Sequence, residues 1–164
     1  MGYTSRMNIH PITPDDHLWV TEFLGYNWGS PTVISRGHIH QADHLPGFIA
    51  RHAGEPSGLI TYYIQGNQCE IVTLDSSVEG IGIGTALVSA VEDAAQNAGC
   101  NRLWLVTTND NTPALALYQK LSFRLAALHR DAVTEARKQK PGLPLYGIDS
   151  IPIRDEIELE IRLQ

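Results

Sequence analysis

The fold is decided by the stretch Glu79-Gly80-Ile81-Gly82-Ile83-Gly84-Thr85, in which three glycines fall within five residues. It separates an apolar segment rich in β-branched residues (68–74) from a segment (82–98) whose apolar residues recur at spacings of three and four. The first pattern predicts a β-strand and the second an α-helix. Glycines let a ligand approach the backbone, and the N–H groups of a first helical turn attract an anion. The turn therefore predicts a phosphate-binding loop.

The spacing of these glycines excludes two common kinds of phosphate loop. A Walker A loop ends in Gly-Lys-Ser/Thr, and no lysine precedes Thr85. The dinucleotide-binding fingerprint is GxGxxG, whereas this chain has GxGxG. A tight strand-to-helix turn without a ligand remains an alternative when this stretch is taken alone.

A second motif lies one predicted helix and one predicted strand downstream, as Asn111-Thr112-Pro113-Ala114-Leu115-Ala116-Leu117-Tyr118-Gln119-Lys120-Leu121-Ser122-Phe123. It resembles Asn-x-x-Ala-x-x-Leu-Tyr-x-x-x-Gly-Phe, a signature of the GNAT superfamily of acetyl-CoA-dependent N-acetyltransferases. The glycine-rich turn resembles the pyrophosphate loop of that family, [Gln/Arg]-x-x-Gly-x-[Gly/Ala]. The pair of motifs is a stronger signal than either one alone.

Two residues depart from the family pattern. Glu79 stands where Gln or Arg is usual, which places a carboxylate near a pyrophosphate. Because the loop binds through backbone N–H groups, we expect weakened rather than lost affinity. Ser122 replaces the usual Gly before Phe123, and we expect this to affect only the turn.

The remaining segments fit the same fold. Apolar or alternating patterns predict strands over residues 8–13, 48–51, 57–64, 102–107, 123–128 and 157–163. A helix is predicted to begin at Thr13-Pro14 and to end at Gly25, followed by a loop, with at most a short helix, over residues 26–40. We therefore expect one α/β domain over residues 1–164, with its core from about residue 8. The resemblance implies a central mixed, mostly antiparallel sheet flanked by helices on both faces.

The resemblance also implies a chemistry, in which an amine attacks the acetyl thioester of acetyl-CoA directly within a ternary complex. The pantetheine arm lies between two separated parallel strands, and the Leu74 N–H polarises the thioester carbonyl. The implied cofactor-binding residues are Thr73, Leu74, Glu79, Gly80, Ile81, Gly82, Ile83, Gly84, Thr85, Asn111, Ala114 and Tyr118.

The implied catalytic residues are Tyr118 and Glu70. Tyr118 matches the tyrosine that protonates the departing thiolate, and a phenol has a suitable pKa for that step. Many family members carry, at the position of Gln68, the glutamate that acts as the general base. Glu70, on the same strand face, is the expected substitute. A water relay or a purely structural role for Glu70 is an alternative, as are a core role for Tyr118 and a helix-capping role for Asn111.

Composition limits the partners. The net charge of −6 argues against nucleic acid and favours a cationic acceptor. No apolar run reaches the roughly 20 residues of a membrane helix. Residues 1–6 lack a signal-peptide core, and Cys69 and Cys100 form no disulfide or metal pattern, so we expect a cytoplasmic protein. A monomer and a homodimer are both compatible with the sequence.

Several segments outside the two motifs are expected near the acceptor or on the surface. Residues 26–29 and 35–44 are expected on the acceptor side of the cleft, and His38, His40 and His44 lack a firm zinc spacing, so no metal is expected. A short basic helix is predicted within residues 131–140. The loop over residues 141–154 either covers the acceptor cleft or mediates self-association.

The predicted function is transfer of the acetyl group of acetyl-CoA to an amine of a small molecule or a peptide. The alternatives are a non-catalytic acyl-CoA-binding module, suggested by Gln68 in place of Glu, and a generic nucleotide-binding domain.

Overall fold

The computed structural model describes residues 7–164, so the prediction made for residues 1–6 lies outside it. Its centre is a seven-stranded sheet. In spatial order the strands are β1 (Met7–Pro11), β4 (Gly47–His52), β5 (Glu55–Gln65), β6 (Gln68–Ser76), β7 (Arg102–Thr108), β9 (Glu156–Arg162) and β8 (Arg124–His129). All neighbours pair antiparallel except β6 and β7, which are parallel. The predicted fold class is confirmed.

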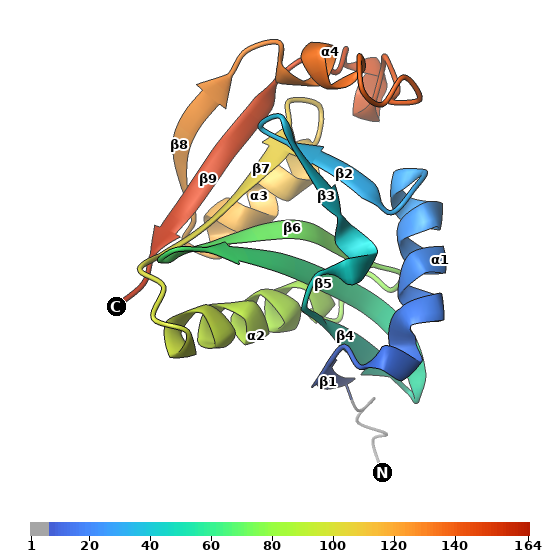
Figure 1. Ribbon diagram of the computed structural model, residues 1–164, viewed down its shortest axis with the longest axis vertical. Helices are drawn as coiled ribbons and strands as arrows, with labels where there is room; N and C mark the ends of the chain where they lie inside the picture. Colours follow the sequence, from blue (N-terminus) through green and yellow to red (C-terminus); the bar gives the residue numbers. More distant parts are fainter. Residues whose placement is uncertain (1–6) are drawn as a thin grey trace.

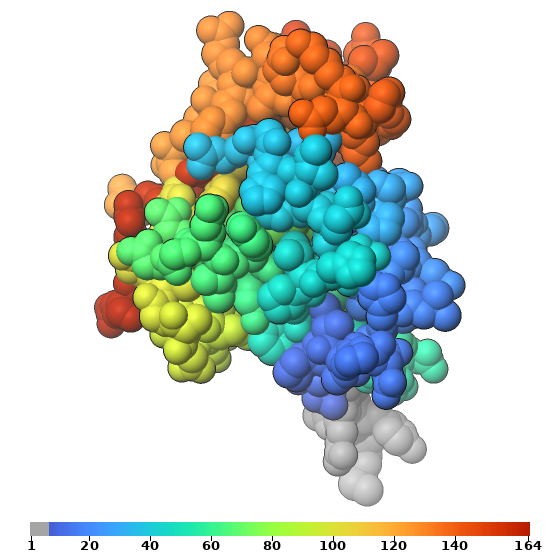
Figure 2. Space-filling model, viewed as in Figure 1, coloured from blue at the N-terminus to red at the C-terminus, as the bar shows by residue number. Residues whose placement is uncertain are grey.

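Helices cover both faces of the sheet (Figure 1). On one face lie α2 (Ile83–Asn97) and α3 (Thr112–Lys120), packed into the larger hydrophobic core. On the other lie α1 (His17–Trp28), which follows a 3-10 turn η1 (Pro14–Asp16), and a small hairpin of β2 (Thr32–Ser35) and β3 (His38–Gln41). The hairpin crosses the middle of this face, as Figure 2 shows for the same view.

The periodicity of the segment after the glycine-rich turn produces α2 as predicted. Its buried positions Ile83, Leu87, Val91 and Ala95 form one stripe that packs on the sheet. Burial of each large aliphatic side chain contributes about 2 kcal/mol. Gly58 on β5 permits the close approach, since a Cβ there would lie 2.6 Å from Cγ2 of Ile83.

Two sequence predictions on the other face are wrong. The first helix does not end at Gly25 but continues to Trp28, where Gly29 adopts a left-handed conformation with φ +81°. Residues 26–40 are not a loop, because they contain β2 and most of β3. The hairpin turn has positive φ at both Arg36 and Gly37, the geometry of a tight two-residue turn that Asn-Gly usually marks.

The C-terminal connection forms an arm beside the hairpin. It contains α4 (Ala132–Ala136) and a 3-10 turn η3 (Ile148–Ser150) before the chain enters β9. The Arg137 guanidinium donates to the carbonyls of Leu143, Pro144 and Ile153, which holds the loop in one compact piece. Among residues 7–164, no helix is both long and apolar enough to cross a membrane.

Candidate active site

The parallel strands β6 and β7 separate partway along their length. They pair only at Gln68 with Arg102, Cys69 with Leu103 and Glu70 with Trp104. Beyond Glu70, β6 remains bonded to β5 and bulges between Ile71 and Thr73, while β7 remains bonded to β9. A bulge increases the local bend of a strand, which turns β6 away from β7. The result is a wedge-shaped gap in the middle of the sheet.

The glycine-rich turn lies at the end of β6, on the open side of the gap. Gly80 and Gly82 have φ +80° and +82°, a conformation that other residues adopt at a cost of about 1–2 kcal/mol. Gly82 caps α2 without any side-chain hydrogen bond, so its first-turn N–H groups are free for an external acceptor. Glu79 is exposed, so its carboxylate can turn away from an anion bound there.

Helix α3 lies behind the gap and begins at Asn111. The Asn111 side chain accepts a hydrogen bond of 3.2 Å from the backbone N–H of Ala114, which confirms the helix-capping role. Its amide nitrogen has no hydrogen bond with the described residues, so it can still bond a ligand. A Cβ at Gly84 of α2 would lie 3.6 Å from Leu117 of α3 and 4.0 Å from Leu74 of β6, so the two signature motifs lie close together.

Tyr118 is buried on α3, with its ring edge-on to Phe123 at 5.5 Å between centroids. Burial, and then the nearby negative charge of Asp75, raise the pKa of its phenol above the ordinary value. The phenol is therefore protonated at neutral pH, the state required of a proton donor.

A cavity of about 260 Å³ opens at the gap on the side of α1 and the hairpin. Its lining comes from the end of α1, both separated strands and the starts of α3 and β9. These residues are Asn27, Trp28, Asp75, Val106, Thr107, Thr108, Asn111 and Glu156. We call it the gap cavity. Asn27 and Trp28, which belong to the segment expected on the acceptor side of the cleft, line this cavity.

Asp75 extends from β6 into this cavity. The indole Nε1 of Trp28 donates to its Oδ2 at 2.6 Å. Burial raises the pKa of the Asp75 carboxyl to about 6, and the indole hydrogen bond acts in the opposite direction. No role for Asp75 was predicted from the sequence, where its position beside Leu74 is the available signal.

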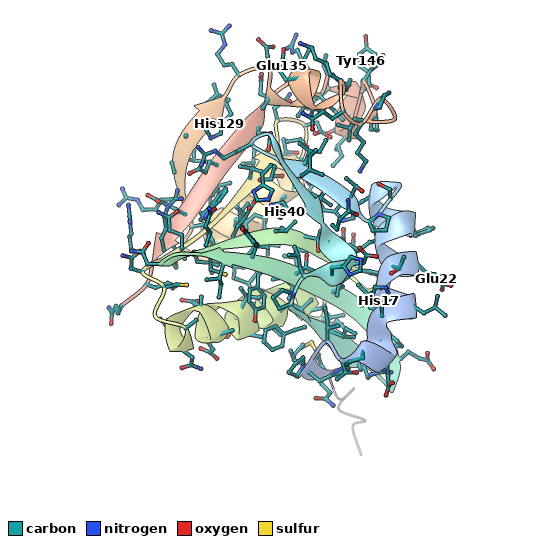
Figure 3. All side chains as sticks on the ribbon, viewed as in Figure 1. His17, Glu22, His40, His129, Glu135 and Tyr146 are labelled. Carbon is teal, nitrogen blue, oxygen red and sulfur yellow. The ribbon has the colours of Figure 1, made fainter. Side chains whose placement is uncertain are left out.

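Glu70 lies at the apex of the gap, under the hairpin, and its side chain is almost fully buried. Oε2 accepts a hydrogen bond of 2.5 Å from Ser35, and Oε1 lies 3.1 Å from Nε2 of His40. Figure 3 shows His40 between the hairpin and the sheet. The ring of His38 stacks on that of His40 at 4.2 Å between centroids. Two of the three clustered histidines therefore belong to the packing of the hairpin on Glu70.

A second cavity, of about 410 Å³, lies beside the hairpin, where β6 and β7 are still paired. We call it the hairpin cavity. Its walls are aromatic and polar, and they consist of Ser35, Arg36, His38, Tyr63, Gln65, Asn67, Gln68, Glu70 and Trp104. Among residues 7–164, no group of three or more His, Cys, Asp or Glu side chains could hold a metal ion.

Strand β9, which lies between β7 and the edge strand β8, carries a network of charges. Glu158 on β9 binds Arg102 at 2.5 Å, Arg36 at 3.2 Å and His129 at 2.9 Å. These donors hold the pKa of Glu158 below its ordinary value, despite its burial. The Arg36 guanidinium also lies over the Trp104 ring, so the hairpin tip is fixed to β7 and β9.

Comparison with known proteins identifies the family. The family model described as "Acetyltransferase (GNAT) family" matches residues 14–123. This chain belongs to the GNAT family of acetyltransferases. Membership confirms the predicted acetyl-CoA co-substrate and the resemblance drawn from the two motifs.

The chain is also similar to individual proteins. The chain is 46% identical to YdhI of Bacillus subtilis over 150 residues, which cover 89% of this chain and 94% of that protein. It is 42% identical to YxbD of the same organism over 159 residues, covering 96% and 100%. A GNAT family acetyltransferase from Elizabethkingia anophelis, solved with acetyl-CoA bound, superposes with a TM-score of 0.69 at 23% identity, covering 96% and 98%. That structure is similar in fold.

Proposed function

We propose that this acetyltransferase moves the acetyl group of acetyl-CoA to a primary amine by direct attack in a ternary complex. The observation that carries the proposal is the separation of β6 and β7 beyond Glu70 and Trp104. In a continuous sheet the backbone N–H and C=O groups of Thr73 and Leu74 that face β7 would bond that strand. The gap leaves them open, so they can bond the acetyl group and pantetheine.

The pyrophosphate binds at the start of α2, on the turn from Glu79 to Thr85. Free first-turn N–H groups and the helix dipole favour a phosphate at this position. Asn111 and Ala114 at the start of α3 contact the cofactor arm. These cofactor contacts rest on the family resemblance, and the local geometry supports them.

Tyr118 acts as the general acid in this proposal. Its helix backs the gap and its phenol stays protonated, so it can donate a proton as the thiolate departs. Glu70 remains the base predicted from the sequence, and the carboxylates around the gap are compared below.

The acceptor is an amine of a small molecule or a peptide. The gap cavity is lined by two acidic side chains and by no Lys, Arg or His, which supports a positively charged acceptor. We further propose that residues 1–164 form one domain. The free, buried thiols of Cys69 and Cys100 support a reducing, cytoplasmic location.

The experiment combines calorimetric titration of acetyl-CoA with a thiol-release assay over a panel of amines. The panel consists of tyramine, spermidine, glucosamine and a short peptide with a free N-terminus. We expect micromolar-range binding and release of CoA that depends on one class of amine. Binding without release by any amine would establish a non-catalytic acyl-CoA-binding module, and binding of ATP without CoA would establish a nucleotide-binding domain.

A further inference from the structure

Two buried carboxylates lie under the tip of the hairpin and differ in what they contact. Glu70 uses both oxygens, one for Ser35 and one for His40. Glu156, the first residue of β9, accepts from a single donor, the backbone N–H of Arg36, which lies 3.3 Å from each carboxylate oxygen. Both side chains are almost completely buried.

Glu156 can bind a ligand without losing its existing contact. A carboxylate offers about four acceptor positions, and one shared backbone N–H leaves most of them open. Glu156 also lines the gap cavity, opposite the Trp28 and Asp75 side of that cavity. Glu70 lines the hairpin cavity instead and belongs to the stretch where β6 and β7 are still paired.

The electrostatic surroundings raise the pKa of the Glu156 carboxyl above its ordinary value. Burial raises the pKa of its carboxyl, and the Glu70 charge acts in the same direction. The Arg36 N–H and the charges of Arg36 and His129 act in the opposite direction. The ionisable groups near Glu156 also include Asp75, which lines the same cavity, and Glu158, which lies two residues along β9 and binds the same Arg36 and His129. A base of this kind works best when its pKa lies near the working pH.

We propose that Glu156 is the general base, and that the acceptor amine enters the gap cavity between Glu156 and Asp75. The assignment rests on the proposed function, and it replaces Glu70 in that role. Glu70 becomes a positioning residue that holds the hairpin through Ser35 and His40.

The chemical step balances with the groups present. The amine nitrogen attacks the thioester carbonyl carbon, and one N–H proton passes to the Glu156 carboxylate as the C–N bond forms. The C–S bond then breaks, the sulfur leaves with the electron pair and takes the phenolic proton of Tyr118. Solvent receives the proton from Glu156 and returns one to Tyr118, so no further reactant is required.

The size and lining of the gap cavity indicate the kind of amine. About 260 Å³ accommodates a compact aminomethyl or amino-acid end group, and the rest of the acceptor must extend outside. Two carboxylates without a lining cation attract an ammonium ion, which must lose a proton before it can attack. Glu156 passes this first proton on to solvent, so its carboxylate is free again to accept the N–H proton when the C–N bond forms.

The test compares Glu156→Gln with the matched variant Glu70→Gln, using the same amine panel in the thiol-release assay. A glutamine oxygen at 156 can still accept from the Arg36 N–H, so the contact is retained while proton uptake is lost. We expect Glu156→Gln to lower kcat/KM about 100-fold or more, to abolish the acidic limb of the pH–rate profile, and to leave the Kd for acetyl-CoA unchanged. Glu70→Gln should keep the acidic limb.

Three outcomes contradict the assignment in distinguishable ways. An intact acidic limb and near wild-type turnover in Glu156→Gln overturn the inference. Loss of the acidic limb in Glu70→Gln alone returns the role of base to Glu70. Wild-type protein that binds acetyl-CoA but acetylates none of the amines overturns the proposed function itself, and the inference with it. Thermal melts of both variants establish that each is folded.

Discussion

The indole of Trp28, at the last position of α1, donates a 2.6 Å hydrogen bond to the Asp75 carboxylate on β6. The bond joins two residues that are 47 positions apart in the sequence and that both line the gap cavity. The hydrogen bond replaces only part of the hydration free energy that the ionised carboxylate loses on burial, since the pKa of Asp75 is still raised from 3.8 to about 6. Ionised Asp75 therefore costs the folded state free energy.

Asp75→Asn should stabilise the protein at neutral pH. The folded-state pKa lies above the ordinary value, so the folded protein gains its advantage at low pH and loses it as pH rises from about 4 to about 6. Asparagine does not ionise and can still accept from the indole. We expect a gain of about 1–2 kcal/mol in unfolding free energy at pH 7, since one pKa unit is worth about 1.4 kcal/mol and the group is partly exposed.

Urea unfolding at pH 7 and pH 4 checks this expectation. At pH 4 the carboxyl is largely protonated in the folded wild type, so the two proteins should differ little. An equal effect at both pH values would show that packing rather than ionisation is responsible.

Tyr118→Phe should reduce turnover while leaving the fold intact. The ring keeps its edge-on contact with Phe123, and only the phenolic oxygen is removed. Loss of a general acid costs about 100-fold or more in kcat. Steady-state kinetics under saturating substrate measure the loss, and calorimetry should give an unchanged Kd for acetyl-CoA. Full turnover at saturation would remove Tyr118 from the mechanism.

Ser122→Gly should stabilise the protein without changing its activity. Ser122 has φ +73°, the left-handed conformation, which explains why the family signature has Gly at this position. Relief of that strain is worth about 1 kcal/mol, or roughly 2–4 °C in Tm for a chain of this size. The reverse change, Gly99→Ser at φ +83° with open space around its Cβ position, should lower Tm by a similar amount. Differential scanning calorimetry of both variants tests the pair.

The sequence was sufficient for the parts of the site that depend on local patterns. The glycine-rich turn, α2 and α3 were all predicted, because each rests on a motif within about a dozen residues. The hairpin was not, because its strands are four residues long and its turn is Arg36-Gly37 rather than Asn-Gly.

The acidic residues of the gap cavity could not be identified from the sequence, because their positions depend on strand pairing between distant segments. Glu156 reaches the cavity because it pairs with Thr108, and because the Arg36 N–H, 120 residues away in sequence, lies over its carboxylate. Alternation along β9 predicts the strand but does not indicate which of Glu156, Glu158 and Glu160 is left without a cation. Those assignments require the positions of Arg36 and Arg102.

Lys140→Met should loosen the C-terminal arm. The Lys140 ammonium donates to the carbonyls of Trp28 at 3.2 Å and Thr32 at 2.7 Å, which ties the arm to the end of α1 and the start of β2. Burial lowers the pKa of this amine, because the charged form loses hydration. The two carbonyl contacts offset part of that loss. Because Trp28 also bonds Asp75, the same lysine supports one wall of the gap cavity.

The matched control is Lys138→Met, which removes only an exposed pair with Glu135. Exposed pairs contribute at most about 1 kcal/mol, so this variant should behave almost as the wild type. Hydrogen exchange over residues 137–155 should accelerate in Lys140→Met and not in Lys138→Met. Unchanged protection in Lys140→Met would mean that the Arg137 bonds to Leu143, Pro144 and Ile153 hold the arm by themselves. Addition of acetyl-CoA with an active amine then distinguishes the two roles suggested for the arm. An arm that covers the acceptor gains protection from exchange when the ligands bind. An arm that mediates self-association gains protection only as the protein concentration rises.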